Sequence, residues 1–207
     1  AIDEGSLAKN PVFAEALEKA KTSRLHFIGL VSDGGVHSHQ DQLIAMVQLA
    51  KKAGVRCIVN PAPASEDAAG LHELADILSP NESEFAAMLQ AHGEDVTAES
   101  VAQRDAAALH ALARKLPCPD TVITLGARGA VLSTPCGFHE FAPPNVSVRD
   151  TTGAGDCFNG ALAAELAHGS ALTDACAFAV LAASCKVERS GAALAMPNRA
   201  DITTRFG

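Results

Sequence analysis

Residues 150–156, with the sequence DTTGAGD, place small residues between two acids, and an apolar helix pattern follows at once. Small residues let consecutive backbone N–H groups point at one spot, and the start of a helix adds about half a positive charge there. The turn therefore predicts an anion-binding site. An acid beside an anion is unfavourable unless it acts as a base on an attacking hydroxyl, which is the role this pattern offers Asp156. The alternative is a capping turn in which Asp156 only satisfies free N–H groups.

The elements that would position this turn alternate along the chain. Helical spacing covers residues 11–22, 39–54, 81–91, 98–115, 155–168 and 171–185. Short apolar runs indicate strands at 25–32, 55–61 and 76–80, a strand–turn–strand over 121–133, and a last strand at 138–143. This alternation predicts an α/β fold: three αβα layers around a doubly wound, mostly parallel sheet, in a single domain over residues 1–207.

Four polar turns follow predicted strands, and their sequences are SDGGVHSH, NPAPASE, PNESE and TLGARG. Ligands of open parallel sheets bind beyond the carboxyl ends of the strands. We therefore expect the four turns to lie on one rim of the sheet.

The composition excludes several classes of partner. The chain of 207 residues has a net charge of −8, without a Lys/Arg cluster to neutralise phosphates and without Trp or Tyr to stack on bases, so no nucleic-acid partner is expected. No apolar run is long enough to cross a bilayer, and the first residues do not resemble a signal peptide. Six scattered cysteines without C-x-x-C spacing predict free thiols and a cytoplasmic protein.

Five motifs occur in an order that resembles the carboxy-terminal half of ribokinase-like (PfkB-type) sugar kinases. They are NPAPA, SPNESE, VITLGARGA, DTTGAGDCFNGALAAEL and VERSGAALAMP, and the resemblance covers residues 55–207. It implies that Asp156 is the base that deprotonates the sugar hydroxyl. It also implies that the backbone of Gly153, Ala154 and Gly155 forms the anion hole for the transferred phosphoryl group.

The same resemblance implies a nucleotide site that uses ATP and Mg²⁺. Asn81 and Glu84 match the N-x-x-E motif, which organises Mg²⁺ and phosphate, with Glu84 acting on the metal through water. Thr124, Gly126 and Gly129 match the turn that contacts the nucleotide. The alternatives are a helix cap for the first pair and a plain hairpin for the turn.

A monovalent-cation site, for K⁺, is also implied. Asp150, Thr152, Lys186 and Gly191 fall where members of this family supply oxygens to such a cation, mostly from the backbone.

Residues 1–54 resemble a different family, the cofactor-independent phosphoglycerate mutases, through the string LHFIGLVSDGGVHSH. The resemblance implies that His37 contacts phosphoglycerate, with Asp33 nearby and His39 in the same loop. The serine nucleophile, the metal ligands and the arginine cluster of a complete mutase are missing from the sequence. If strand 25–32 lies beside 55–60, these histidines approach the rim that holds Asp156; the alternative is two exposed loop histidines.

The two resemblances together predict a chimera with a mutase-like segment over 1–54 and a ribokinase-like nucleotide-binding segment over 55–207. The Gly-Gly-x-x-x-Asn sugar motif of the kinases is absent from the sequence. We therefore expect binding of a nucleotide or phosphate to survive better than catalysis, and a homo-oligomer to cover an apolar sheet edge. Three functions stay open: a ribokinase-like phosphotransferase, a recombined fold without catalysis, and a phosphoglycerate-binding module.

Overall fold

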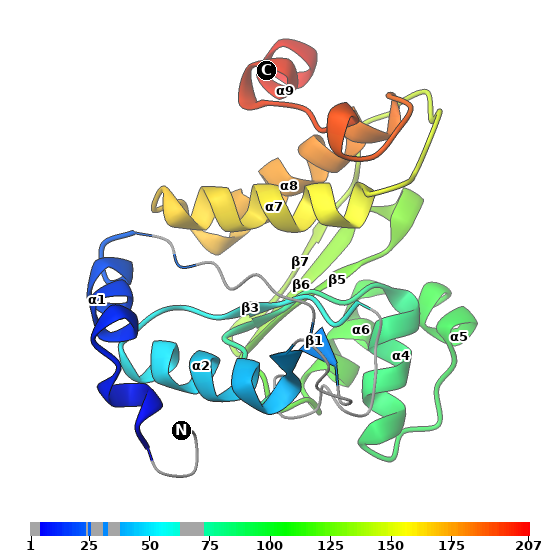
Figure 1. The fold of residues 1–207 in the computed structure, drawn as a ribbon. Helices are drawn as coiled ribbons and strands as arrows, with labels where there is room; N and C mark the ends of the chain where they lie inside the picture. Colours follow the sequence, from blue (N-terminus) through cyan, green and yellow to red (C-terminus); the bar gives the residue numbers. More distant parts are fainter. Residues whose placement is uncertain (1–4, 24, 26–30, 33–37, 63–72) are drawn as a thin grey trace.

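A five-stranded sheet forms the centre of the molecule (Figure 1). The computed structural model describes residues 5–23, 25, 31–32, 38–62 and 73–207. The strands follow one another in chain order: β3 (Ile58–Val59), β4 (Ile77–Leu78), β5 (Asp120–Thr124), β6 (Ala130–Thr134) and β7 (Gly137–Phe141). Pairing is parallel from β3 to β5 and antiparallel from β5 to β7. The predicted α/β fold is confirmed, with an antiparallel hairpin extending the parallel part.

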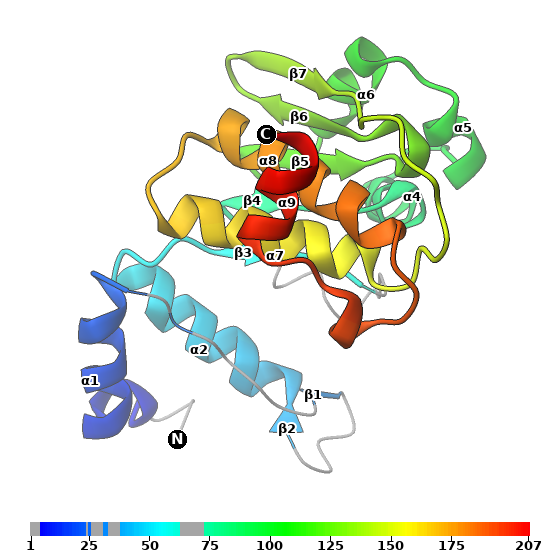
Figure 2. The ribbon, with the colours of Figure 1, turned by 90° about the horizontal axis from the view of Figure 1, so that it is seen from above.

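Helices cover both faces of the sheet, as the three-layer prediction requires (Figures 1 and 2). One layer consists of α7 (Ala154–Ala167) and α8 (Leu172–Val187). The other contains α4 (Glu82–Ala91), α5 (Ala98–Ala102) and α6 (Ala106–Ala113). Strand residues alternate between the layers, because side chains of neighbouring strand positions point to opposite faces. Ile77 packs with the α7–α8 layer, whereas Leu78 packs with the α4–α6 layer.

Local signals set most helix boundaries. Pro11 stands at the first position of α1 (Pro11–Ala20), and the Asn10 side chain accepts two N–H groups there. The predicted helix 98–115 is two helices, because the Asp105 carboxylate caps the Ala108 N–H at 2.8 Å and begins α6. The last helix, α9 (Arg199–Phe206), and the short 3-10 helix before it, η4 (Ala193–Ala195), were not predicted from the sequence.

The amino-terminal part adds a short 3-10 helix, η1 (Leu7–Lys9), followed by α1 and α2 (Gln40–Lys52). Strand β1 (Val31–Ser32) pairs in parallel with β2 (Ser38–His39) in a separate two-stranded sheet. The prediction that segment 25–32 lies beside 55–60 therefore does not hold for Val31 and Ser32; residues 26–30 lie outside the described part.

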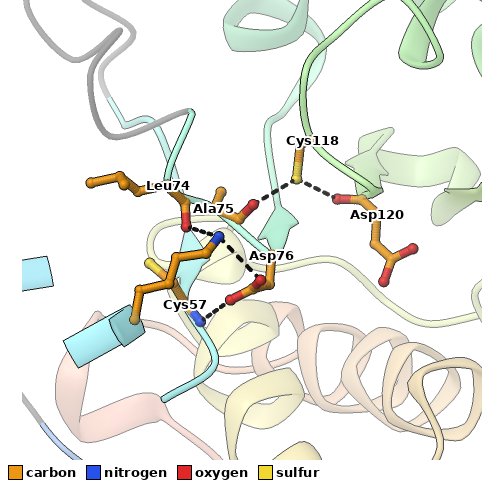
Figure 3. A network of polar contacts seen from close by, with 7 residues as sticks. Cys57, Leu74, Ala75, Asp76, Cys118 and Asp120 are labelled. Carbon is orange, nitrogen blue, oxygen red and sulfur yellow. Dashed lines mark hydrogen bonds and ion pairs between the residues drawn. The ribbon is translucent and has the colours of Figure 1, made fainter. Parts of the chain in front are cut away.

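A polar network ties α2 to the amino ends of the central strands (Figure 3). The Asp76 carboxylate accepts the Cys57 N–H at 2.8 Å and pairs with the Lys51 ammonium at 3.2 Å. The Lys51 ammonium also donates to the Leu74 carbonyl at 2.6 Å. This network joins the segment predicted to be mutase-like to the sheet of the kinase-like segment.

Over the described ranges, no helix combines the length and the apolar character needed to span a bilayer. All six cysteines are free thiols, as predicted, and four of them are buried.

Candidate functional site

Three loops at the carboxyl ends of the parallel strands lie against one another. The Thr124 N–H donates to the Pro80 carbonyl at 2.9 Å, and Asn81 and Thr124 form a parallel bridge. The Asn60 amide donates to the Ser79 carbonyl at 2.7 Å. Parallel strands place their carboxyl ends on one side of a sheet, so the expected rim is formed by the start of NPAPASE, by PNESE and by TLGARG. The SDGGVHSH turn lies mostly outside the described residues.

Asn81 and Glu84 form a capping box at the start of α4. The Asn81 side chain accepts the Glu84 N–H at 2.9 Å, and the Glu84 carboxylate accepts the Asn81 N–H at 2.9 Å. Glu84 is only 8% exposed, and this burial raises the pKa of its carboxyl group. The capping alternative is thus realised, but Glu84 is a buried acid and not a solvated one.

The TLGARG turn closes the β5–β6 hairpin through a 3-10 helix, η3 (Gly126–Arg128). The Leu125 N–H donates to the Gly129 carbonyl at 2.8 Å, and the Gly129 N–H donates to Gly126 at 3.1 Å. Both glycines have positive φ, at +53° for Gly126 and +85° for Gly129. The backbone of this turn is therefore that of a hairpin connection, which was the alternative to a nucleotide-contacting turn.

Arg128 is a residue of this turn that the sequence reasoning missed. Its guanidinium donates to the carbonyl of Arg104 at 2.8 Å and to that of Ala102. The turn is thereby fixed to the loop between α5 and α6, which follows the PNESE helix. The two carbonyls lie 26 and 24 positions before Arg128 in the chain, so no local pattern indicated this contact.

The DTTGAGD turn opens α7 with backbone N–H groups left free on both sides of Ala154. Gly153 is the N-cap, with φ of +73°, and the Ala154 N–H already donates to the Thr151 carbonyl at 3.1 Å. The N–H groups of Gly153, Gly155 and Asp156 have no acceptor among the described residues. Of the predicted set of Gly153, Ala154 and Gly155, only the Ala154 N–H already has an acceptor within the chain.

The Asp156 side chain is exposed and makes no hydrogen bond or ion pair within the described ranges. No side-chain cap bond is present at the start of α7, so Asp156 does not serve as the capping acid. Figure 1 shows that α7 and α4 both begin on the same side of the sheet, one in each helical layer. A free carboxylate beside free N–H groups leaves room for a base next to an anion.

A frame of hydrogen bonds holds the turn from behind. The Asp150 carboxylate accepts the Thr152 N–H at 2.9 Å and the Gly191 N–H at 2.8 Å. These bonds, first that from Gly191, lower the pKa of Asp150 to about 2. The N–H of Arg149 donates to the Val187 carbonyl at 2.7 Å, which joins the turn to the end of α8.

Lys186 is completely buried at the same place. Its ammonium donates to the carbonyls of Asp150 at 3.1 Å and Arg189 at 3.4 Å. The structure thus brings Asp150, Thr152, Lys186 and Gly191 together, as the predicted cation site requires. However, K⁺ on the Asp150 carbonyl would lie a few ångströms from the lysine ammonium, and like charges at this range repel strongly. These residues do not fit a bound K⁺.

Met196 is a second residue that sequence reasoning missed. A Cβ atom on Gly153 would come within 3.0 Å of the Met196 methyl group and 3.7 Å of an Asp156 carboxylate oxygen. Met196 packs with Cys157, Ile202 and their neighbours in a small core cluster. It lies two positions after Leu194 in a stretch without periodic apolar spacing, so no local pattern indicated it.

Of the three predicted residues of the grafted loop, Asp33 and His37 lie outside the described residues. His39 is the N-cap of α2: its Nδ1 accepts the Asp41 N–H at 3.2 Å. Among its described contacts, the His39 side chain therefore has a structural role, as the cap of α2.

A family model described as pfkB family carbohydrate kinase matches residues 5–199. The chain belongs to this family. The match begins well before Val55, so it does not confirm a boundary of the kinase-like segment near that residue.

Relatives in the family are ribokinases. The ribokinase of Schizosaccharomyces pombe is 34% identical over 161 residues, which make up 77% of this chain and 49% of the relative. The structure of Arabidopsis thaliana ribokinase complexed with ribose and ATP superposes with a TM-score of 0.64 at 28% identity, over 80% of this chain and 52% of that chain. The chain spans about half the length of the ribokinases it matches.

A short segment is similar to a second protein. The 2,3-bisphosphoglycerate-independent phosphoglycerate mutase of Akkermansia muciniphila is 55% identical over 58 residues, which are 28% of this chain and 11% of the mutase. A member of the pfkB family thus carries a partial mutase-like segment.

Proposed function

We propose that this chain carries the phosphoryl-transfer half of a ribokinase-like, ATP-dependent carbohydrate kinase, with Asp156 as its base. The observation that carries the proposal is the exposed Asp156 carboxylate, without a protein partner in the described part, beside the free N–H groups at the start of α7. In the reaction, Asp156 takes the proton of an acceptor hydroxyl while that oxygen bonds to the γ-phosphorus. The bond between this phosphorus and the β–γ bridging oxygen breaks, and ADP leaves.

The N–H groups of Gly153, Gly155 and Asp156 are the proposed anion donors. They stand at the positive end of a helix of 14 residues, where an anion is stabilised. Because Ala154 already bonds to Thr151, its N–H contributes only if the turn rearranges on binding.

Asn81, Glu84, Thr124, Gly126 and Gly129 are the proposed nucleotide and Mg²⁺ residues. One Glu84 carboxylate oxygen is engaged by Asn81, and the other has no protein partner among the residues described, so it fits a water bound to Mg²⁺. Bound Mg²⁺ supplies positive charge that neutralises the phosphates. No cluster of three metal-ligating side chains occurs in the described ranges, which suits a metal held largely by phosphates and water. The matching ribokinase with ribose and ATP supports ATP as the nucleotide.

Turnover is proposed to be weak or absent. The sequence lacks the Gly-Gly-x-x-x-Asn motif that the kinase resemblance requires for holding the sugar. Phosphoryl transfer depends on positioning, so a base without an acceptor in register adds little rate.

Calorimetric titration with ATP·Mg²⁺, combined with an ADP-release assay with ribose as acceptor, tests this proposal. Binding by the wild-type chain is expected, and any turnover should fall about 100-fold or more in Asp156→Asn while ATP binding is retained. Asp174→Asn is the matched control, because Asp174 is an exposed acid in the first turn of α8. Equal turnover in Asp156→Asn would contradict the role of the base, and ATP binding without turnover would indicate a recombined fold without catalysis.

A second candidate function rests on the mutase-like segment. The 55% identity to a phosphoglycerate mutase over 58 residues favours a phosphoglycerate-binding module, in which His37 contacts the ligand, Asp33 and His39 belong to the same loop, and the join lies near residue 54. Titration with 3-phosphoglycerate tests it, and loss of binding in His37→Ala but not in His39→Ala would support it.

The reducing cytoplasm is the proposed compartment. Six free thiols without a disulfide support it, since oxidising compartments favour disulfide formation.

A further inference from the structure

Lys186 is a buried cation without a carboxylate ion-pair partner. It is 0% exposed, and its ammonium contacts only the backbone carbonyls of Asp150 and Arg189 among the residues described. Moving an ammonium into the protein interior costs several kcal/mol unless other groups compensate. The burial of the Lys186 ammonium therefore requires groups that compensate its charge.

The surroundings of Lys186 are arranged to stabilise a positive charge. Two carbonyl oxygens accept from the ammonium, and Lys186 stands in the last turn of α8, where the helix dipole is negative. The Asp150 carboxylate adds a negative charge nearby, and Lys186 in turn is one of the charges that lower the pKa of Asp150.

The ammonium joins two segments that are far apart in sequence. It links the carbonyl of Asp150, at the start of the DTTGAGD turn, to the carbonyl of Arg189, just beyond α8. Two further bonds close the same junction: the Gly191 N–H donates to the Asp150 carboxylate, and the Arg149 N–H donates to the Val187 carbonyl. The ammonium therefore lies at the junction between the turn and the end of α8.

We propose that the Lys186 ammonium is a built-in cation that positions the anion-binding turn 150–156, and that it replaces an exchangeable monovalent cation in this chain. The inference deepens the proposed function, because the turn is the proposed phosphate site. Lys186 is a positioning residue: it reaches the anion only through the backbone of the turn. A tethered ammonium differs from a bound K⁺ in that it is always present and does not respond to the salt in solution.

The wild-type chain alone gives the first test. Its melting temperature and its affinity for inorganic phosphate are compared in chlorides of K⁺, Na⁺ and tetramethylammonium at equal ionic strength. The built-in cation predicts the same values in all three salts. A rise in melting temperature or phosphate affinity that is specific to K⁺ would overturn the inference.

Lys186→Ala gives the second test, because it removes the ammonium and leaves its carbonyl partners in place. In tetramethylammonium chloride this variant should melt at a lower temperature and bind phosphate about three- to thirtyfold more weakly. Ammonium or K⁺, both small enough to reach the vacated carbonyls, should restore both properties. Lys115→Ala is the matched control, since Lys115 is exposed and pairs with Glu94 on the surface.

A variant that melts and binds like the wild type in tetramethylammonium, or that no small cation rescues, would count against the inference. If Lys186→Ala does not fold, the salt series on the wild type still decides. If the wild-type chain binds neither phosphate nor ATP·Mg²⁺, the proposed function fails, and the melting temperatures still test the cation separately.

Discussion

At the residue scale, two glycines of the TLGARG turn have different physical tasks. A Cβ atom on Gly129 would lie 1.9 Å from the Phe141 carbonyl oxygen, whereas a Cβ atom on Gly126 would meet nothing within 4 Å. Both have positive φ. Gly129 therefore allows β7 to pass close to the turn, and Gly126 only supplies its backbone conformation.

Gly129→Ala is expected to lower the free energy of unfolding by about 2–4 kcal/mol, because backbone strain and a steric clash add together. Gly126→Ala, the matched control, should cost only about 1–2 kcal/mol from its left-handed conformation. Urea denaturation of the two variants measures the difference. Equal losses would show that the contact with Phe141 does not constrain this position.

The lowered pKa of Asp150 predicts how the stability of the folded chain changes in acid. Its pKa is about 2 in the folded chain, below its ordinary value of 3.8, so its ionised form contributes stability above pH 3.8. That contribution should be lost as the pH falls from about 4 to about 2. In Asp150→Asn, the stability at neutral pH should be lower and its fall over this interval smaller. Thermal melting as a function of pH measures both, and an unchanged pH profile would contradict the assignment.

At the element scale, α9 and the segment before it support the anion-binding turn from behind. Met196 packs against Gly153, Gly191 donates to Asp150, and Ile202 lies 4% exposed in the same core cluster. Ion pairs between Arg189 and Asp201 and between Arg205 and Glu188 hold α9 to the end of α8. A helix that contains none of the predicted site residues thus packs in the same cluster as the methionine behind the turn.

Ile202→Ala is expected to destabilise the chain by about 2–4 kcal/mol through the cavity it leaves. It should also weaken phosphate binding, because Met196 loses its packing partner. Thr204→Ala, on the exposed face of α9, should change the stability by less than about 0.5 kcal/mol. Chemical denaturation and phosphate titration measure the two effects. Unchanged phosphate affinity in a clearly destabilised Ile202→Ala would separate α9 from the site.

At the scale of the whole molecule, burial is unevenly distributed. Helices α1 and α2 each bury one alanine, whereas α7 buries four residues and α8 eight. The contacts that attach α2 include the ion pair of Lys51 and Asp76, each about one-third exposed, and such pairs contribute little. The amino-terminal helices are therefore held less firmly than the kinase-like core.

Hydrogen exchange is expected to show this difference. Amides of α1 and α2 should exchange about tenfold or more faster than those of α7 and α8, because local opening exposes little apolar surface. Mass spectrometry of peptides after timed labelling measures the rates. Equal protection in both regions would mean that the chain opens only as one cooperative unit.

Self-association is a further prediction at this scale. Among the described residues β3 has only β4 as a neighbour, and we predict that a second copy of the chain packs at this end of the sheet. Light scattering coupled to size exclusion should give a mass above the 21.2 kDa of one chain. A mass of one chain at all concentrations would contradict a homo-oligomer.

The sequence by itself determined the α/β class, most helix starts and the chemistry of the turns. These features depend on short-range signals: apolar periodicity, the Asn81 and Asn10 caps, and small residues before a helix. The tertiary structure alone decided which groups of the turns are free. It showed that Ala154 is already bonded, that Glu84 is buried in a cap, and that the Lys186 ammonium bonds to the Asp150 carbonyl. Lys186 and Asp150 are separated by 36 positions, and no local pattern encodes a contact that only the packing of α8 against the turn creates.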